Sequence, residues 1–356
     1  MSKAPALASY LTTASQRIRS MARVAVAQLP TPLEEVPRLS RQLGGPRLFF
    51  KRDDLTGAGL GGNKVRKLEY VIGKAMVEGA DTLVLSGGFQ SNLARIAAAL
   101  GARLGLEVEL VLGGLPDEPR PTVGNLLLDQ LFGARITLVD TVPRWEFGDA
   151  VEQVAAAARR RGRKPFVVPL GGSGPEGMAS YVAATTELLE QCDTLGLCPD
   201  YLAVAIGSGG TFGGLMLGAL NLHAPYQVLG ISVSRTREYL REKIPADTAA
   251  AATVLQLAAR PSANDLLLYD EYIGEGYGRP TAAGNAAIAL VARSEGIVLD
   301  PVYSGKCMAG LIDLIGRREI AADATVVFLH TGGSPALFAY RPEQLGLGLG
   351  VQEPSG

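Results

Sequence analysis

The feature that most limits the fold of this chain is the alternation of short apolar, β-rich runs with amphipathic helical runs from Arg47 onward. Parallel strands need a crossover connection, and helices supply it while covering the sheet. At 356 residues the chain is also too long for one small core. The sequence therefore predicts an α/β protein of two domains, each an open, twisted, mostly parallel sheet with helices on both faces.

The positions of the elements follow from this alternation. Strands are predicted at 47–52, 82–85, 108–112, 136–139, 166–169, 201–206, 227–233 and 325–329. Helices are predicted at 64–78, 92–104, 122–132, 145–161, 175–190, 211–220, 235–259, 281–294 and 306–315.

Two breaks in the pattern indicate the domain boundaries. Residues 160–164 are charged and contain a glycine, and residues 53–62 are rich in glycine. We therefore expect residues 54–163 to form a smaller α/β domain. Residues 1–53 and 164–356 would share the larger one.

Composition excludes several classes of function. The formal net charge is -1 and no basic block is present, so we expect no nucleic-acid partner. The apolar runs are too short to span a membrane. Cys192, Cys198 and Cys307 form no CxxC pair and there are only two histidines, so we expect neither a disulfide framework nor a metal site. Residues 1–33 are basic but lack a long apolar segment, and we expect a cytoplasmic protein.

The stretch 61–70, GGNKVRKLEY, is the first of several junctions that could hold a ligand. Its two glycines free the backbone, and Asn63 suits the position just before a helix. Lys64 would then lie at a helix N-terminus, where the macrodipole opposes its positive charge. This placement suits an amine that must be neutral to attack a carbonyl. A flexible lead-in to a helix is the alternative interpretation.

Two further junctions are rich in glycine and hydroxyl side chains. Segment 86–92, SGGFQSN, would offer backbone N–H groups to a carboxylate or phosphate, although Ser91 and Asn92 are also ordinary helix caps. Segment 207–214, GSGGTFGG, partly matches a dinucleotide fingerprint, and its Ser and Thr add donors. No Walker lysine follows, so we expect a phosphate cradle that does not serve a nucleoside triphosphate.

Three late segments are polar loops next to predicted helices. They are GEGYGRP at 274–280, DPVYSGK at 300–306 and HTGGSP at 330–335. Each of them alone is consistent with plain turn structure.

Taken together and in this order, these segments resemble the D-cysteine desulfhydrase and 1-aminocyclopropane-1-carboxylate (ACC) deaminase family. That family belongs to the tryptophan-synthase-β-like, fold type II enzymes that use pyridoxal 5'-phosphate (PLP). KRDD at 51–54, GGNKVRKLEY, DPVYSGK and HTGG carry the resemblance, which covers the chain from about residue 30 to 337. It implies a PLP-dependent lyase, a small amino-acid substrate and a homodimer, with the cofactor on the larger domain.

The resemblance also implies roles for individual residues. Lys64 matches the lysine that holds PLP as a Schiff base. The other cofactor-binding residues would be Asn92 at the phenolic oxygen, Gly207, Ser208, Gly209, Gly210 and Thr211 at the phosphate, and Thr331 facing the pyridine nitrogen. The substrate would contact Gln90, Ser91, Asn92, Leu93 and Ser304. Ser91, Tyr277 and Tyr303 would act with Lys64 in catalysis.

Three of these positions bear on the type of reaction. Thr331 offers the ring nitrogen a hydroxyl in place of a carboxylate, so the nitrogen would stay uncharged and the shallower electron sink would favour prompt loss of a β substituent. The deaminases carry Leu at this position and Glu at that of Ser304, so both residues match the desulfhydrase branch. Leu93 stands where many desulfhydrases have His and deaminases have Gln. It makes this wall drier and favours a longer or more apolar substrate, or β-replacement.

The expected reaction is α,β-elimination from D-cysteine to pyruvate, sulfide and ammonia, with Lys64 moving the proton at Cα. Elimination of sulfite from L-cysteate and PLP-dependent β-replacement or sulfur transfer are alternatives that use the same residues. ACC deamination and a non-catalytic amino-acid sensor are less favoured. A nicotinamide oxidoreductase is a further alternative, and the glycine loop at 207–214 is the only feature that supports it.

Overall fold

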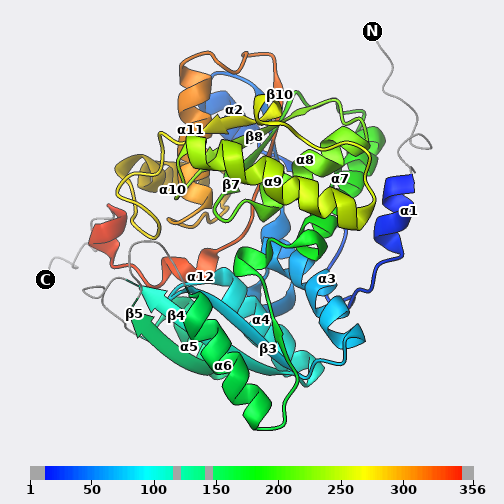
Figure 1. Ribbon diagram of the computed structural model, residues 1–356. Coiled ribbons are helices and arrows are strands. Elements are labelled where there is room, and N and C mark those ends of the chain that lie inside the picture. Colours follow the sequence, from blue (N-terminus) through cyan, green and yellow to red (C-terminus); the bar gives the residue numbers. More distant parts are fainter. Residues whose placement is uncertain (1–12, 115–121, 141–146, 347–356) are drawn as a thin grey trace, which may run out of the picture.

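The computed structural model describes residues 13–114, 122–140 and 147–346. It contains two sheets, which lie one above the other in Figure 1 with helices packed around each. The α/β architecture predicted from the alternation of strands and helices is confirmed.

The larger sheet has six strands in the order β1-β2-β10-β7-β8-β9. These strands are β1 (Leu33–Glu35), β2 (Arg47–Lys51), β7 (Tyr201–Ile206), β8 (Gln227–Ser232), β9 (Leu267–Tyr269) and β10 (Thr325–Leu329). In the described part of the chain only β1 runs antiparallel to its neighbour. The smaller sheet has four parallel strands in the order β5-β4-β3-β6. They are β3 (Thr82–Gly88), β4 (Glu107–Gly114), β5 (Arg135–Asp140) and β6 (Pro165–Val167).

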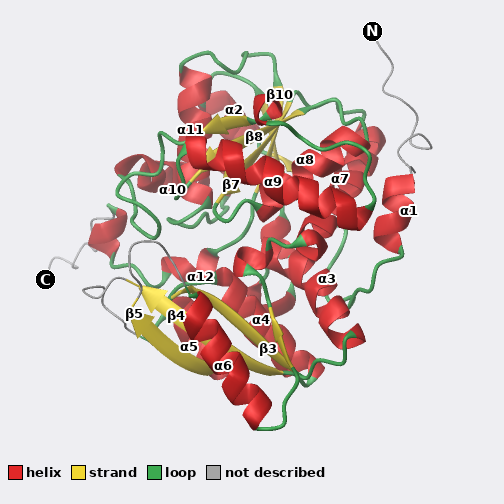
Figure 2. Cartoon of the chain, viewed as in Figure 1, coloured by secondary structure: helices red, strands yellow, loops and turns green. Residues whose placement is uncertain are grey.

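Helices cover both faces of each sheet (Figure 2). One face of the larger sheet packs against α2 (Pro37–Gln42), α10 (Ala282–Glu295) and α11 (Ser304–Gly316), and the other against α7 (Pro175–Leu195), α8 (Gly210–Asn221) and α9 (Arg237–Leu255). The smaller sheet packs against α3 (Asn63–Val77), α4 (Asn92–Leu104) and α5 (Gly124–Leu131) on one face and α6 (Gly148–Arg160) on the other. The remaining helices are α1 (Thr13–Arg19), α12 (Ser334–Leu337) and the short 3-10 turns η2 (Asp53–Leu55), η3 (Ala58–Leu60), η4 (Leu170–Gly172), η5 (Ala263–Asp265) and η6 (Pro342–Leu345).

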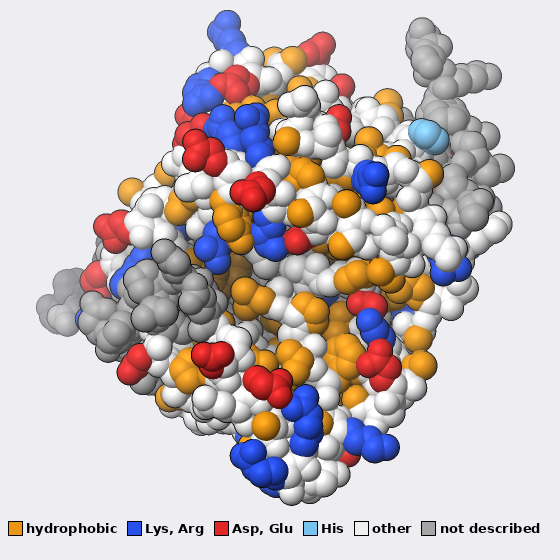
Figure 3. Space-filling model, viewed as in Figure 1, with side chains coloured by type: hydrophobic (Ala, Val, Ile, Leu, Met, Phe, Trp, Pro, Cys, Tyr) orange, Lys and Arg blue, Asp and Glu red, His pale blue; other side chains and the backbone are white. Residues whose placement is uncertain are grey.

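The surface view shows how side chains are distributed around these layers. In Figure 3, hydrophobic side chains gather across the middle of the visible face, over the region where the two sheets meet. Charged side chains lie mainly above and below it. No helix in the described ranges is both long enough and apolar enough to span a bilayer.

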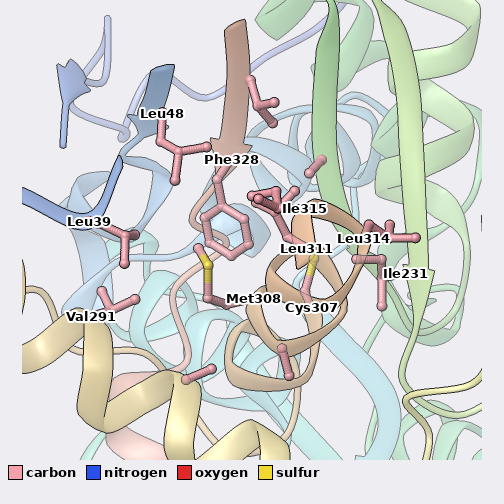
Figure 4. Close-up of a cluster of buried hydrophobic side chains, with 14 of the residues drawn as sticks. Leu39, Leu48, Ile231, Val291, Cys307, Met308, Leu311, Leu314, Ile315 and Phe328 are labelled. Atoms are coloured by element: carbon pink, nitrogen blue, oxygen red, sulfur yellow. The ribbon is translucent and has the colours of Figure 1, made fainter. Parts of the chain in front are cut away.

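The core of the larger sheet explains why the sequences of its central strands are continuously apolar. Successive side chains of a strand point to opposite faces, so both faces of a covered strand must be apolar. On β10, Val326 and Phe328 join one hydrophobic cluster, while Val327 and Leu329 join the cluster on the other face. Phe328 packs on Phe50 of β2 with ring centroids 5.0 Å apart. Figure 4 shows Phe328 among the side chains of the first cluster.

The structure corrects several predicted boundaries. The strand predicted at 82–85 continues to Gly88, because residues 86–88 keep pairing with β4. Pro165–Val167 (β6) pairs with β3, so a division after residue 163 separates this strand from its sheet. The predicted division of the chain into domains is otherwise untested and stays a prediction. The predicted start of a helix at residue 145 lies outside the described residues.

Candidate active site

A cavity of about 360 Å³ lies at the carboxyl ends of β3 and β7, where parallel sheets commonly bind ligands. Its volume falls within the roughly 300–1,000 Å³ typical of small-molecule sites. Most of the predicted site residues lie on its wall, namely Lys64, Ser91, Asn92, Leu93, Gly207, Ser208, Gly209, Thr211, Tyr277, Tyr303 and Thr331.

Lys64 reaches the wall because of the turn before α3. Gly61 and Gly62 have φ of +68° and +119°, and a Cβ on Gly61 would lie 1.9 Å from the Asp54 carbonyl oxygen, so only glycine fits there. The Lys64 Nζ donates a hydrogen bond to the Gly171 carbonyl oxygen at 3.1 Å. Burial lowers the pKa of Lys64 to about 8. A substantial fraction of this amine is therefore neutral at mildly alkaline pH.

Lys67 is a second buried amine that the sequence analysis missed. It lies three residues after Lys64 on the same face of α3, and its Nζ also donates to the Gly171 carbonyl oxygen, at 3.1 Å. Burial and the neighbouring Lys64 charge hold the pKa of Lys67 well below its ordinary value. The three-residue spacing puts both lysines on one face of the helix, but it does not show that Lys67 is buried. Of the two, only Lys64 lines the cavity.

The glycine loop after β7 has the features of a phosphate site. It ends at the N-terminus of α8, where the first N–H groups lack partners within the helix and the macrodipole favours an anion. The Ser208 Oγ hydrogen-bonds the Ser173 Oγ at 2.7 Å. A Cβ on Gly210 would lie 2.6 Å from the same Ser173 oxygen, so glycine is needed there, although Gly210 itself is not on the wall.

Asn63 ties this loop to α3. It is the first residue of α3, and Gly62, not Asn63, precedes the helix. The Asn63 Nδ2 donates to the Thr211 Oγ1 at 3.0 Å, and the Asn63 backbone N–H donates to the Thr331 carbonyl oxygen at 3.0 Å. The helix that carries Lys64 is therefore held at a fixed distance from the phosphate loop.

The amide of Asn92 is oriented by its neighbours. Its Oδ1 accepts hydrogen bonds from the Asn125 Nδ2 at 2.9 Å and from Arg95 at 3.4 Å, which leaves its Nδ2 to donate into the cavity. Ser91 is the N-cap of α4, and its Oγ accepts from the Ala94 N–H at 3.2 Å. The Ser91 hydroxyl hydrogen can still be donated to a ligand. These two side chains can therefore present donors to an anionic ligand.

Two tyrosines on the cavity wall contact each other. The hydroxyls of Tyr277 and Tyr303 hydrogen-bond at 2.7 Å, with ring centroids 5.7 Å apart. Burial and the neighbouring Tyr277 raise the pKa of Tyr303 well above its ordinary value. Tyr303 is therefore neutral near pH 7, and its hydroxyl can donate a hydrogen bond.

Hydrogen bonds to its carbonyl groups hold the loop that carries Tyr277. Lys306 is fully buried, and its Nζ donates to the carbonyl oxygens of Ile273 at 2.7 Å and Gly276 at 2.8 Å. The Tyr340 hydroxyl donates to the Gly278 carbonyl oxygen at 2.7 Å. These bonds give a structural reason for the lysine that ends DPVYSGK.

The structure does not bring the Gln90 and Ser304 side chains to the cavity. Gln90 donates to the Val123 carbonyl oxygen at 3.0 Å and accepts from the Asn125 N–H at 2.8 Å. The Ser304 Oγ donates to the Asp300 Oδ1 at 2.6 Å. The hydrogen-bonding capacity of both side chains is used inside the protein. They support the turns that carry Ser91 and Tyr303, and neither side chain lies on the cavity wall.

The turn after β10 places Thr331 on the wall. His330 is fully buried; its Nε2 donates to the Val298 carbonyl oxygen at 3.0 Å and its Nδ1 accepts from the Gly332 N–H at 3.2 Å. Burial lowers the pKa of His330, which agrees with this neutral form. Among the wall residues that the structure describes, the only carboxylate is that of Glu275.

Comparison with known proteins decides the family. The model of pyridoxal-phosphate dependent enzymes matches residues 24–332. The chain belongs to this family of pyridoxal-phosphate dependent enzymes. It is 41% identical to the D-cysteine desulfhydrase of Salmonella typhi over 324 residues, which are 90% of this chain and 96% of that protein. It is 40% identical to that of Klebsiella pneumoniae over 330 residues, 92% of this chain and 98% of that one.

Solved structures agree with this assignment. A structure of an ACC deaminase homologue superposes with a TM-score of 0.85 at 37% identity, covering 94% of this chain and 98% of that one. Threonine deaminase isoform 2 from Solanum lycopersicum shares the fold, with a TM-score of 0.62 at 18% identity over 92% of this chain and 84% of that one. The family resemblance and the fold type II architecture inferred from the sequence are confirmed.

Proposed function

We propose that this member of the family is a PLP-dependent lyase that performs α,β-elimination on D-cysteine, releasing pyruvate, sulfide and ammonia. The observation that carries the proposal is the Lys64 amine, with its lowered pKa, in one cavity with a glycine-rich helix N-terminus. The two desulfhydrases at 41% and 40% identity over almost the whole chain support D-cysteine as the substrate.

The cavity wall fits PLP group by group. The N-terminus of α8 with Ser208 and Thr211 would bind the phosphate, because hydroxyls and free N–H groups meet there. The Asn92 Nδ2 would donate to the phenolic oxygen, the Thr331 hydroxyl would meet the pyridine nitrogen, and the Lys64 Nζ would bond to the aldehyde carbon. When bound, PLP supplies a sink for the electron pair left at Cα of the substrate.

The protein's own groups would then bind the substrate and move its protons. The Lys64 amine would take the proton from Cα of the substrate as a general base. The Ser91 hydroxyl and the α4 N-terminus hold the substrate carboxylate. Tyr303, neutral and paired with Tyr277, donates a hydrogen bond to the departing sulfur. Leu93 keeps water from that wall. D-cysteine and one water yield pyruvate, ammonia and hydrogen sulfide, so atoms balance.

Substrate comparison tests this proposal. Purified holoenzyme is incubated separately with D-cysteine, L-cysteate and ACC. We expect pyruvate and sulfide in equal amounts from D-cysteine and no 2-oxobutyrate from ACC. Sulfite release from L-cysteate at a higher kcat/KM than sulfide release from D-cysteine would favour the sulfo-lyase alternative. Production of 2-oxobutyrate, or no product from any of them, would contradict the proposal.

The lowered pKa of Lys64 predicts how cofactor capture depends on pH. Only the neutral amine attacks the aldehyde, and with a pKa of about 8 roughly one molecule in ten has it at pH 7. The rate of PLP capture by the apoprotein should therefore rise about tenfold per pH unit below pH 8 and level off above it. Stopped-flow absorbance over pH 6–10 measures this rate. A rate that still climbs at pH 10 would indicate an unperturbed lysine.

The assembly and location of the protein follow from family likeness. We propose a cytoplasmic homodimer, in keeping with the family resemblance and the bacterial desulfhydrase relatives. Sedimentation equilibrium of the holoenzyme measures the oligomeric state, and a single species of monomer mass would reject the dimer.

A further inference from the structure

A fully buried arginine lies behind the cavity wall. The side chain of Arg95, on α4, is 0% exposed. It donates hydrogen bonds to the carbonyl oxygens of Gly59 and Gly61, the second at 3.1 Å, and these glycines belong to the turn that leads into α3 and Lys64. It also donates to the Asn92 Oδ1 at 3.4 Å. One cation therefore binds both segments that bring Lys64 and Asn92 to the cavity.

The charge of Arg95 is not neutralised by its surroundings in the part of the chain that the structure describes. Burial lowers the pKa of Arg95 to about 10, which still leaves it charged near pH 7, and Asp129 is the one carboxylate that opposes this shift. Burial raises the pKa of Asp129 to about 8, so most of this carboxyl is uncharged near pH 7. A buried cation without a counter-charge is costly, and an anion bound close to it offsets that cost.

Asn92 connects this charge with the cavity. Its Oδ1 accepts from Arg95 and from Asn125, so its Nδ2 is the group left to donate to a ligand. Hydrogen bonds in a chain polarise one another, and an amide whose oxygen is bound by a cation is therefore a stronger donor. The aldehyde and the phenolic oxygen of PLP are on neighbouring ring carbons, so Lys64 and Asn92 must be held at a set distance to meet both.

We propose that Arg95 is a positioning residue, which fixes the distance between Lys64 and Asn92 and, through the Asn92 amide, stabilises the phenolic oxygen of PLP as an anion. The inference rests on the PLP binding proposed above, and it assigns a role to a residue that touches neither cofactor nor substrate. The ionised oxygen is the anion that offsets the buried charge. Arg95 therefore favours a cofactor that has this oxygen over one that lacks it.

The test measures this preference in matched variants. Full-length wild type, Arg95→Gln, Arg95→Lys, Asn92→Ala and the double variant Arg95→Gln/Asn92→Ala are freed of cofactor. Each is titrated with PLP and with 3-deoxypyridoxal 5'-phosphate, which lacks the phenolic hydroxyl. The ratio of the two dissociation constants is the readout, because damage to the fold weakens both alike. Arg103→Gln is the control, because Arg103 is exposed in the last turn of the same helix.

We expect wild type and Arg103→Gln to bind PLP at least about tenfold more tightly than the analogue. Arg95→Gln and Asn92→Ala should bind the two nearly equally. The double variant should show no further change, since the arginine acts through the amide. Arg95→Lys should retain part of the preference, because it keeps the charge but not the fork of donors.

Asp129→Asn is a second variant that leaves Arg95 in place. Neither carboxyl oxygen of Asp129 has a hydrogen-bond partner among the described residues, so the change removes no bond from the fold. At pH 6.5 its preference should equal that of wild type. At pH 9 the wild-type carboxyl is ionised and offsets the Arg95 charge, so Asp129→Asn should prefer PLP about threefold more strongly than wild type. This comparison decides the inference even if Arg95→Gln does not fold.

Three results would overturn the inference and leave the proposed function standing. An equal loss of affinity for PLP and the analogue in Arg95→Gln would mean that the arginine only supports the fold. A preference that falls further in the double variant would mean that Arg95 acts without Asn92. Equal preferences of wild type and Asp129→Asn at pH 9 would mean that the charge does not act on the phenolic oxygen. No binding of PLP by wild type would reject the proposed function as well.

Discussion

Replacing Lys64 by alanine should abolish catalysis, lowering kcat by at least about 1,000-fold. The change removes both the amine that would attach PLP and the base that would take the Cα proton. Release of pyruvate from D-cysteine with excess PLP measures the loss. Lys64 lies in the first turn of α3, and burial lowers its pKa to about 8, toward the range of a reactive amine.

Lys74→Ala is the matched control. Lys74 lies on the same helix but is exposed and forms a surface ion pair with Glu176 at 2.8 Å. Its loss should leave kcat within about twofold of wild type, because surface pairs contribute little. Sulfide release retained in Lys64→Ala at more than a tenth of the wild-type rate would refute the role of Lys64.

The second large effect is on stability, and it involves the buried partner of a residue in the first turn of the same helix. Asp53, from the KRDD segment, is fully buried and accepts hydrogen bonds from Arg66 at 2.9 Å, Thr31 at 2.9 Å and the Tyr181 hydroxyl at 2.7 Å. Asp53→Asn should lower the free energy of unfolding by about 3–5 kcal/mol, because it leaves the buried Arg66 short of a counter-charge. Urea unfolding of the apoprotein measures the change.

Glu35→Gln is the control for this stability measurement. Glu35 pairs with Arg47 at 3.1 Å on the surface, where both side chains are about half exposed, so its loss should cost less than about 1 kcal/mol. If Asp53→Asn cost no more than Glu35→Gln, the buried cluster would not be the source of stability.

The same cluster predicts a pH dependence. Burial alone would raise the pKa of Glu187, but Arg66 and Lys51 outweigh it and lower the pKa to about 2. The stability that Glu187 contributes is therefore present above its ordinary pKa of 4.5 and is lost as the pH falls toward 2. The Asp53→Asn variant should accordingly unfold at a higher pH than wild type during acid titration.

Elements whose own residues determine their structure could be predicted from the sequence. Elements that depend on pairing with a neighbour could not. The strands Tyr201–Ile206 and Thr325–Leu329 were located to the residue, because both are uninterrupted apolar runs buried on two faces. The three-residue edge strands β1 and β9 were missed, since pairing with a neighbour, and not their own pattern, makes them strands. The strand β3 was cut short because glycine at 87 and 88 indicates a turn in isolation.

The site residues fall into the same two groups, those that could be predicted and those that could not. Lys64 and the phosphate loop could be placed because glycine and helix-start patterns are local. Lys67 could not, because only packing shows that its long side chain is buried beside Gly171. Ser304 was predicted to face the substrate, yet Asp300, four residues earlier, takes its hydroxyl.

The most direct test of the account is to locate the covalent bond between protein and cofactor. The holoenzyme is reduced with borohydride and digested, and the peptide that carries the cofactor is sequenced by mass spectrometry. We expect a single label on Lys64 and none on Lys67, whose amine bonds the same carbonyl oxygen. A label on Lys67, or no label on α3 in a protein that is active with D-cysteine, would contradict it.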